Sequence, residues 1–428
     1  MCNGKRRALQ TSGCVSRTSS LLKLSGSIDG DDEKKGEASS SANAKNASSS
    51  RFERVIFHVD MDSFYASCEL SLRPELKDTP FIVGADPKDG KGRGVVIACN
   101  YPARKLGVRS ALPISKAWEL CPQAVYVRPN FDFYGRVSEA VFEIIRQFAD
   151  RVEQVSIDEA YLDVTGRVAS MMMMMLSQDH KANDDQQEYS IRSLASSIKE
   201  SIREKQGITC SIGVAESKIV AKIATDMNKP DGLTIVKPEK VMDFLAPLPV
   251  GRIPGVGKVT EGILNSRFGI RTIADLRGTP IEDLESAFGR NGAWLHNVAN
   301  GIDRSEVVER WEHVSLSGET TFEQDESDFS KVAKAMYDVA QDVHRRAVSE
   351  NYTFRNVGIK VRFSGFETHT RSRSLKVPTT SLEILNAECE KLLSEFARSG
   401  KKVRLIGVRV SSLERSAEGQ SSLLDWQK

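Results

Sequence analysis

Two stretches of the chain alternate between apolar and polar residues as β-strands do, and both meet a cluster of acids. The first, VIFHVDMDSFY at residues 55–65, is a Val, Ile and Phe run that ends in Asp60 and Asp62. In the second, VSIDEAYLDV at residues 155–164, Asp158 and Glu159 separate two apolar runs. Because neighbouring side chains on a strand point to opposite faces, these two acids converge only at a turn. We therefore predict a β-hairpin whose tip carries Asp158 and Glu159.

The acids of the two stretches suit the same chemistry. Asp60 and Asp62 are two residues apart, which predicts that both lie on one face of the first strand. Carboxylates that converge repel each other unless they share a cation, and hard oxygen ligands suit Mg²⁺. Two Mg²⁺ ions held between such strands would activate an attacking hydroxyl and neutralise phosphates. The pattern predicts phosphoryl or nucleotidyl transfer, although any one of these acids alone could be a solvated turn residue or a helix cap.

The rest of the first half alternates between helical and strand patterns. We expect helices at 64–72, 191–206 and 217–228, a strand at 209–214, and a turn at KPDG, residues 229–232. Residues 167–190, which include five consecutive methionines, are expected to form a surface insertion. Strand, helix, paired strands, helix and strand together predict a ferredoxin-like domain.

The C-terminal part repeats this order. Strands are expected at 315–322, 353–363, 367–377 and 403–411, with helices at 328–349 and 380–398, which makes a second βαββαβ unit. Residues 352–378 hold six basic residues against one acid, Glu367. Such a stripe can simply protect a sheet edge, but its interleaved Ser and Thr suit contact with phosphates. Its basic residues are Arg355, Lys360, Arg362, Arg371, Arg373 and Lys376.

Composition narrows the class of protein. The chain has 428 residues, 40% hydrophobic and 28% charged, enough for two or more domains, and no run that could span a membrane is expected. The net charge is only +2, so any positive electrostatic field that attracts nucleic acid must come from local groups of basic residues. Seven cysteines without a CxxC pair predict reduced thiols and no zinc site. Residues 1–53 are expected to be a disordered tail, although the first 28 residues, which lack acids, also have the composition of a transit peptide.

The motifs themselves resemble those of a known family. HVDMDSFYAS and SIDEAYLDVTG resemble the two signature motifs of Y-family DNA polymerases of the DinB/kappa type, and the resemblance continues through CNYPARKLGVRSALP, SIGVAESKIVAKIATDMNKPDG and IPGVGKVT. It covers residues 54–414 and implies an α+β multidomain fold. The palm would be 54–79 and 130–246, the fingers 80–129, the helix-hairpin-helix thumb 247–311 and the little finger 312–414, with a flexible tail at 415–428.

The resemblance also implies roles for residues. Asp60, Asp158 and Glu159 would be catalytic and hold two Mg²⁺ ions, with the Met61 carbonyl as a further ligand, whereas Asp62 is usually not a ligand in the family. The incoming dNTP would contact Phe64, Tyr65, Tyr101, Arg104 and Lys229. Primer–template DNA would contact Gly255, Gly257, Lys258 and the six basic residues of 352–378. The implied activity is low-fidelity translesion synthesis without proofreading, by a monomer in the cytoplasm of a prokaryote or the nucleus of a eukaryote.

The end of the chain carries one further motif. Gln420, Leu423 and Trp426 have the spacing of short peptides that resemble sliding-clamp ligands, while the alternative is a frayed terminus that packs on the little finger. Two other functions compete with the polymerase. A nucleotide cyclase can also pair palm carboxylates with two metals, but it needs neither a helix-hairpin-helix nor a basic sheet. A non-catalytic DNA-binding scaffold would not need the full carboxylate set.

Overall fold

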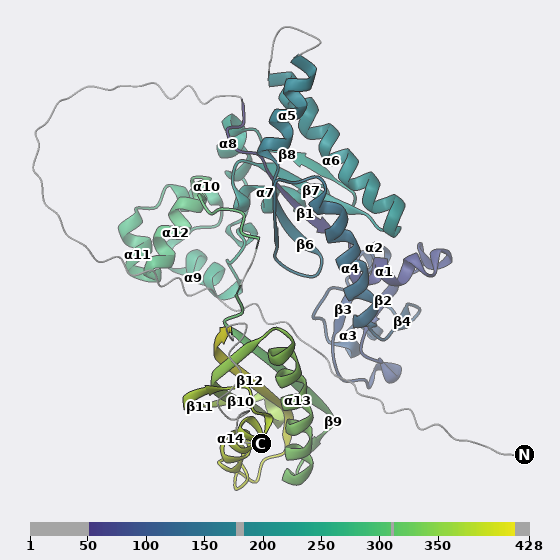
Figure 1. The fold of residues 1–428 in the computed structure, drawn as a ribbon, viewed down its shortest axis with the longest axis vertical. Helices are drawn as coiled ribbons and strands as arrows, with labels where there is room; N and C mark the ends of the chain where they lie inside the picture. The colour runs from purple at the N-terminus through teal and green to yellow at the C-terminus, as the bar shows by residue number, and fades with distance from the viewer. Residues whose placement is uncertain (1–50, 177–183, 310–311, 416–428) are drawn as a thin grey trace, which may run out of the picture. The chain divides into compact units, whose positions relative to one another are not determined.

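The computed structural model describes residues 51–176, 184–309 and 312–415 (Figure 1). The described chain divides into two compact units, one within residues 40–310 and one that starts at residue 311. Most of the predicted N-terminal tail and the whole predicted clamp peptide lie outside the described residues. No helix among the described residues is long and apolar enough to cross a membrane.

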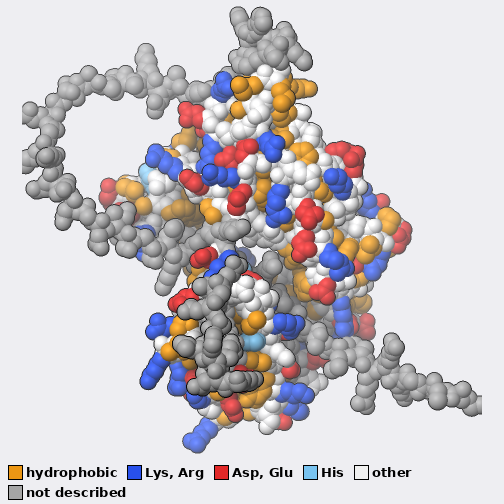
Figure 2. All heavy atoms as spheres, in the orientation of Figure 1, with side chains coloured by type: hydrophobic (Ala, Val, Ile, Leu, Met, Phe, Trp, Pro, Cys, Tyr) orange, Lys and Arg blue, Asp and Glu red, His pale blue; other side chains and the backbone are white. Residues whose placement is uncertain are grey.

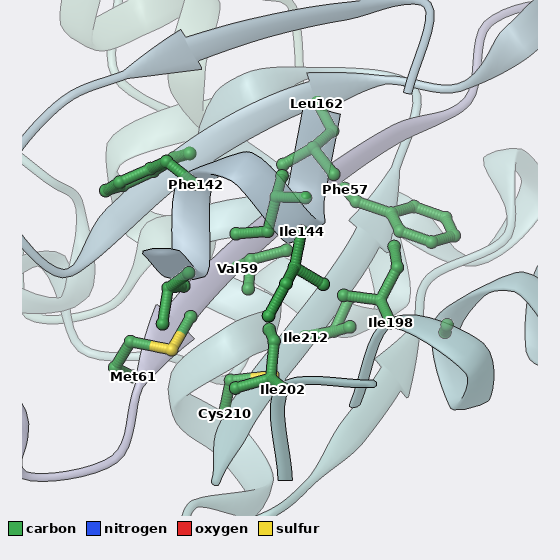
Figure 3. Packing of buried hydrophobic residues seen from close by; sticks show 14 of the residues in the cluster. Phe57, Val59, Met61, Phe142, Ile144, Leu162, Ile198, Ile202, Cys210 and Ile212 are labelled. Atoms are coloured by element: carbon green, nitrogen blue, oxygen red, sulfur yellow. The ribbon is translucent and has the colours of Figure 1, made fainter. Parts of the chain in front are cut away.

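The first unit is built on a five-stranded sheet in the order β5-β6-β1-β7-β8. Its strands are β1 (Ile56–Met61), β5 (Arg151–Gln154), β6 (Glu159–Asp163), β7 (Cys210–Ala215) and β8 (Leu233–Ile235). Helices α4 (Phe131–Arg146) and α6 (Asp184–Gln206) supply apolar side chains to one face. There they pack against Phe57, Val59 and Met61 of β1, as Figure 3 shows. Helix α7 (Lys218–Thr225) packs on the opposite face, where Thr225 bonds to His58.

The segment expected to be a surface insertion is largely helical. Helix α5 (Thr165–Leu176) contains the methionine run, and α6 begins at Asp184 rather than at residue 191. Val168 and Met172 lie one helical turn apart and are buried in the core, whereas Met173 and Met174 are exposed. Part of the methionine run therefore packs in the core, because one face of helix α5 is turned towards the core and the other is exposed.

A smaller sheet and a helical module complete the first unit. Strands β2 (Phe81–Gly84), β3 (Val96–Cys99) and β4 (Val125–Val127) form a sheet in the order β3-β2-β4, joined by α2 (Tyr101–Lys105) and α3 (Ile114–Leu120) around their own small core. Helix α1 (Phe64–Ser71) links this sheet to β1. The helical module contains α8 (Val241–Leu245), α9 (Lys258–Phe268), α10 (Ile273–Arg277), α11 (Ile281–Phe288) and α12 (Arg290–Ala299).

The chain that leaves the helical module is fixed to the palm by a buried ion pair. Lys218, at the start of α7, bonds to both carboxylate oxygens of Glu153 at 2.6 and 2.8 Å, and its ammonium also donates to the Glu306 carbonyl. Glu153 in turn accepts the backbone N–H of Val308. Side-chain exposures of 11% for Lys218 and 3% for Glu153 make this a closed contact.

The second unit is one four-stranded sheet in the order β11-β10-β12-β9, with every described pairing antiparallel. Its strands are β9 (Ser315–Glu326), β10 (Tyr352–Phe363), β11 (Thr368–Thr379) and β12 (Val403–Arg415). Helices α13 (Phe329–Ser349) and α14 (Leu382–Ser394) pack on one face against a core that includes Val357, Ile359 and Val361. The predicted βαββαβ order is confirmed, and β11 is an edge strand.

Candidate active site

The predicted carboxylates meet where β1 and β6 lie side by side. The register of the two strands places Asp60 directly opposite Glu159, and the Met61 N–H donates to the Asp158 carbonyl at 2.9 Å. Since Phe57, Val59 and Met61 face the core, the strand period turns Asp60 to the other face, where α7 packs. The hairpin between β5 and β6 thus brings Asp158 and Glu159 to the end of β1, as the sequence pattern predicts.

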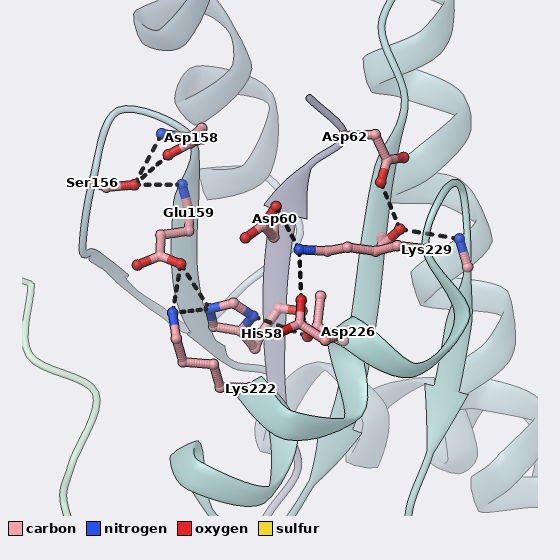
Figure 4. A network of polar contacts seen from close by, with 12 residues as sticks. His58, Asp60, Asp62, Ser156, Asp158, Glu159, Lys222, Asp226 and Lys229 are labelled. Carbon is pink, nitrogen blue, oxygen red and sulfur yellow. Dashed lines mark hydrogen bonds and ion pairs between the residues drawn. The ribbon is translucent and has the colours of Figure 1, made fainter. Parts of the chain in front are cut away.

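Two of the three carboxylates contact lysines (Figure 4). Lys229 Nζ lies 3.0 Å from Asp60 Oδ1 and 2.8 Å from Asp226 Oδ1. Lys222 Nζ lies 2.5 Å from Glu159 Oε2. Asp158 instead accepts a hydrogen bond from the Ser156 hydroxyl. In this arrangement no three His, Cys, Asp or Glu side chains of the described residues converge as metal ligands.

Burial and mutual repulsion shape the protonation of these acids. Burial, opposed by Lys229 and reinforced by Asp158, raises the pKa of Asp60 to about 6. The pKa of Asp158 is also raised, first by burial and then by the charge of Glu159. Burial acts in the same direction on Glu159, but its polar contacts with His58 and Lys222 overcome this effect and lower the pKa to about 2. The end of β1 therefore carries more negative charge than its surroundings stabilise, which favours binding of a cation.

Asp62 does not belong to this cluster. Its carboxylate accepts hydrogen bonds from Thr209 Oγ1, Ser211 Oγ and the Asp231 N–H, each at 2.8 Å. The prediction that Asp60 and Asp62 share a face is wrong, because β1 ends at Met61 and the chain then turns. Figure 4 shows that the carboxylates of Asp60 and Asp62 contact different residues. Asp62 is 3% exposed and ties β1 to β7 and to the turn before β8.

A cavity of about 250 Å³ next to the carboxylates is lined by all five predicted nucleotide contacts. The Arg104 guanidinium lies 5.1 Å from the centre of the Tyr101 ring, as expected for residues one turn apart. The hydroxyls of Ser63 and Tyr101 are buried without a hydrogen-bond partner among the described residues, and burial raises the pKa of Tyr101 to about 12. The cavity therefore has polar groups in place for a ligand. Its predicted lining residues are Asp60, Met61, Phe64, Tyr65, Tyr101, Arg104, Asp158 and Lys229.

Two aromatic side chains lie at one wall of this cavity. Phe64 is buried, whereas Tyr65 is partly exposed and packs against Phe131 and Tyr134, with ring centres 6.0 and 4.9 Å apart. Ser63 precedes them in the left-handed conformation, at a φ of 49°, where the strand turns into α1. A larger cavity of about 380 Å³ lies in the small sheet, between Trp118 and Tyr126, and contains none of the predicted site residues.

The predicted DNA contacts of the helical module are exposed. Gly257 caps α9, and Gly255, Gly257 and Lys258 are all accessible to solvent. Gly255 has a φ of +98°, and a Cβ there would lie 3.2 Å from the Trp294 ring, so both conformation and space favour glycine. Backbone N–H groups at the start of α9 are thus open to an anion.

The basic stripe of the second unit is divided by the pleat of its sheet. Arg371 and Arg373 contact Glu395 and Glu388 of α14, at 3.0 and 3.5 Å, so they lie on the helix-covered side. Residues of β10 and β11 that pair in register, Lys360 with Thr370 and Arg362 with Thr368, belong to the opposite face. Lys360 bonds to Glu319 there, and Lys376 is exposed. Arg355 bonds to the Leu375 carbonyl. At least four of the six residues are therefore divided between the two faces of the sheet and do not form one stripe.

The sequence analysis did not identify three residues near these surfaces. His58, buried and with its pKa lowered to about 4 chiefly by burial, lies 3.5 Å from Glu159. Lys222 of α7 bonds to Glu159, a contact between residues 63 apart in the chain that no local spacing indicates. Arg409 of β12 pairs with Gly358 of β10, so its positive charge lies on the same face of the second sheet as Lys360.

The donor set fits divalent cations. Asp60 and Asp158 line one cavity, the charge of Asp158 helps to raise the pKa of Asp60, and Lys229 already places a positive charge beside Asp60. Hard oxygen donors of this kind are those that Mg²⁺ prefers. Glu159 could join them after separating from Lys222, with the Met61 carbonyl as a further oxygen donor.

Comparisons with known proteins agree with this geometry. The model of the impB/mucB/samB family matches residues 59–226, that of its C-terminal domain 313–423, and that of the thumb domain of DNA polymerase-iota 251–303. DNA polymerase IV of Methanoculleus marisnigri is 46% identical over 370 residues, which is 86% of this chain and 97% of that protein. DNA polymerase IV 2 of Methanosarcina mazei is 43% identical over 385 residues, covering 90% and 99%.

Solved structures are similar along the same part of the chain. A chimera of the Y-family DNA polymerases Dbh and Dpo4 has a TM-score of 0.75 and 29% identity, covering 85% of this chain and all of that one. An insertion ternary complex of Dbh DNA polymerase has a TM-score of 0.59 and 29% identity over the same shares. The α+β fold with palm, thumb and C-terminal sheet is thereby confirmed. The chain belongs to the Y-family DNA polymerases, in their DinB-type DNA polymerase IV branch, and is a DNA-directed DNA polymerase.

Proposed function

We propose that this polymerase carries out translesion synthesis by transferring a nucleotide from a dNTP to the 3′-hydroxyl of a primer, with two divalent cations, Mg²⁺ by preference. The observation that carries the proposal is the register of β1 and β6, which sets Asp60 opposite Glu159 and beside Asp158. The same cavity holds Arg104 and Lys229, whose charges suit a triphosphate. Bound cations would lower the pKa of the 3′-hydroxyl and neutralise the phosphates.

The chain's own residues then have distinct tasks. Asp60 and Asp158 hold cations, and Glu159 either ligates one or receives the proton of the 3′-hydroxyl. Arg104 and Lys229 bind phosphate oxygens, with Tyr101 supplying its buried hydroxyl. Tyr65 lies beside the nucleotide sugar and excludes a 2′-hydroxyl, with Phe64 supporting it from the core. All of these residues except Glu159 line the cavity next to Asp60, which supports the proposed tasks.

Binding of primer–template DNA would use two further surfaces. The start of α9, with Gly255, Gly257 and Lys258, suits a phosphate because open N–H groups bind anions without reading sequence. The basic residues of β10 and β11 suit the duplex backbone. On the face drawn in Figure 2, acidic and basic side chains are interspersed. DNA would therefore be attracted by local groups of basic residues.

Two finer points belong to the proposal. We propose that the enzyme has low fidelity and no proofreading exonuclease, as its resemblance to Y-family polymerases implies. We also propose that it acts as a monomer and is tethered to a sliding clamp by Gln420, Leu423 and Trp426.

Primer extension tests the proposal. The full-length protein, Mg²⁺ and four dNTPs should extend a primer on undamaged and lesion-bearing templates, and Asp158→Asn should not. Lys237→Met is a suitable control, because it breaks a surface ion pair with Glu188 away from the cavity. Wild-type-like extension by Asp158→Asn would refute the proposed cation site, and a well-folded wild-type protein that stops at every lesion would refute translesion synthesis.

A further inference from the structure

Glu159 shares its counterion with a histidine. Lys222 Nζ lies 2.5 Å from Glu159 Oε2 and 3.5 Å from His58 Nε2. The other ring nitrogen, Nδ1, lies 2.9 Å from Thr225 Oγ1. The Thr225 hydroxyl donates its proton to backbone carbonyls. The carbonyl of Ala221 lies 2.9 Å away and that of His58 3.1 Å away.

This network assigns the direction of each hydrogen bond. Because the Thr225 hydroxyl donates to a carbonyl, it accepts from His58 Nδ1–H. His58, which is 1% exposed, then presents the lone pair of Nε2 to Lys222. The ammonium of Lys222 therefore has two fixed acceptors, the Glu159 carboxylate and the His58 ring.

Lys222 also differs from the lysine one turn before it. The side chains of Lys218 and Glu153 are 11% and 3% exposed, and several backbone groups close around them. The side chains of Lys222 and Glu159 are 27% and 18% exposed, so the contact is open to exchange. An ammonium at 2.5 Å covers the carboxylate oxygen that a metal ion would use, and two cations cannot share that position without repulsion.

We propose that Lys222 is a resident counterion of Glu159 that positions the carboxylate in the free enzyme and competes with a divalent cation for it. When Glu159 turns to the cation, His58 remains as the second acceptor that keeps the Lys222 ammonium on α7. Lys222 thereby lowers the affinity of the free enzyme for the cation. This inference rests on the proposed two-metal function.

Direct binding of Mn²⁺ tests the competition without relying on turnover. The free Mn²⁺ signal in electron paramagnetic resonance is titrated with full-length protein, with and without primer–template DNA and a dNTP. Lys222→Met should bind Mn²⁺ about fivefold more tightly than wild type, the equivalent of removing one partly exposed ion pair. Lys222→Arg keeps the charge and should show wild-type affinity or weaker. Lys237→Met, which breaks the ion pair with Glu188, should change nothing.

The outcomes separate the inference from the proposed function. Unchanged or weaker Mn²⁺ binding by Lys222→Met, with a wild-type melting temperature, overturns the inference; Lys222→Gln takes its place if the methionine variant does not fold. In a Glu159→Gln background the gain from Lys222→Met should disappear, and its persistence would equally overturn the inference. If wild type and every variant fail to bind Mn²⁺ even with DNA and dNTP, the two-metal function fails as well.

Discussion

The two main sheets are built alike and carry opposite charges. Each has helices that pack an apolar face, α4 and α6 in the first unit and α13 and α14 in the second. The first sheet gathers its acids at the ends of β1 and β6, partly buried and in contact with lysines. The second spreads its bases along strands β10, β11 and β12, most of them exposed.

This difference fits the two proposed tasks, which are catalysis at the first sheet and DNA binding at the second. Chemistry at one phosphorus atom needs charges that converge and are shielded from water, because electrostatic stabilisation is strongest there. Holding a duplex needs charges at intervals, each in partial contact with solvent, whose effects add up through the release of counterions. Single changes in the first sheet should therefore abolish turnover, whereas changes in the second should weaken binding by degrees.

The largest expected effect comes from the acidic sheet. Asp158→Asn should lower primer extension by about a thousandfold, because it removes a charged oxygen donor from the cation site. Affinity for primer–template DNA, measured by fluorescence anisotropy, should stay within about twofold, since the basic sheet is unchanged. Near-wild-type extension by Asp158→Ala or Glu159→Ala would show that the catalytic site lies elsewhere.

A change at the cavity wall should alter selectivity rather than turnover. Tyr65→Ala should raise incorporation of ribonucleotides over deoxynucleotides by roughly ten- to a hundredfold, because the ring no longer excludes the 2′-hydroxyl. The measurement is the ratio of kcat/KM for a matched pair of rNTP and dNTP. Phe131→Leu is the control, since it loses a contact with Tyr65 without lining the cavity. An unchanged ratio in a folded Tyr65 variant would mean that the ring serves only the core.

The basic sheet allows a comparison of its two faces. Neutralising Arg371 and Arg373 together should weaken DNA binding for all sequences and make the salt dependence shallower by about one to two units of log–log slope. Neutralising Lys360 and Arg362 should have at least as large an effect, because Arg371 and Arg373 both contact carboxylates, whereas in the second pair Lys360 contacts Glu319 and Arg362 bonds to the Thr368 hydroxyl. Salt titrations of affinity compare the two double variants, and wild-type slopes in both would place DNA on another surface.

The smallest effect on the isolated enzyme is expected from the terminus. Removal of residues 420–428 should leave extension on a short oligonucleotide unchanged, since neither sheet is altered. On a long template with the cognate clamp loaded, the same removal should abolish stimulation, because the tether raises the local concentration of enzyme at the primer end. Equal stimulation of both forms would reject the clamp peptide.

The sequence by itself determined the order of the elements and the positions of the acids that are proposed to be catalytic. The period of two in 55–61 and the acids between two apolar runs in 155–164 predict a strand and a hairpin tip, because local backbone geometry fixes where such side chains point. The periodicity of apolar residues in the same way predicts the βαββαβ order of the second unit. It failed at Asp62, where a strand ends one residue earlier than the alternation implies.

Only the tertiary structure decided which charges meet. Lys218 and Lys222 look alike on one helix, yet one is closed around Glu153 and the other is open beside Glu159. Arg371 and Lys360 appear in one basic stripe, yet the pairing of β10 with β11 puts them on opposite faces. The partners of these side chains are up to 164 residues away in the chain, so no local pattern records them. Pairing across strands and helices, rather than spacing along the chain, sets whether a charge is a structural contact or part of a site.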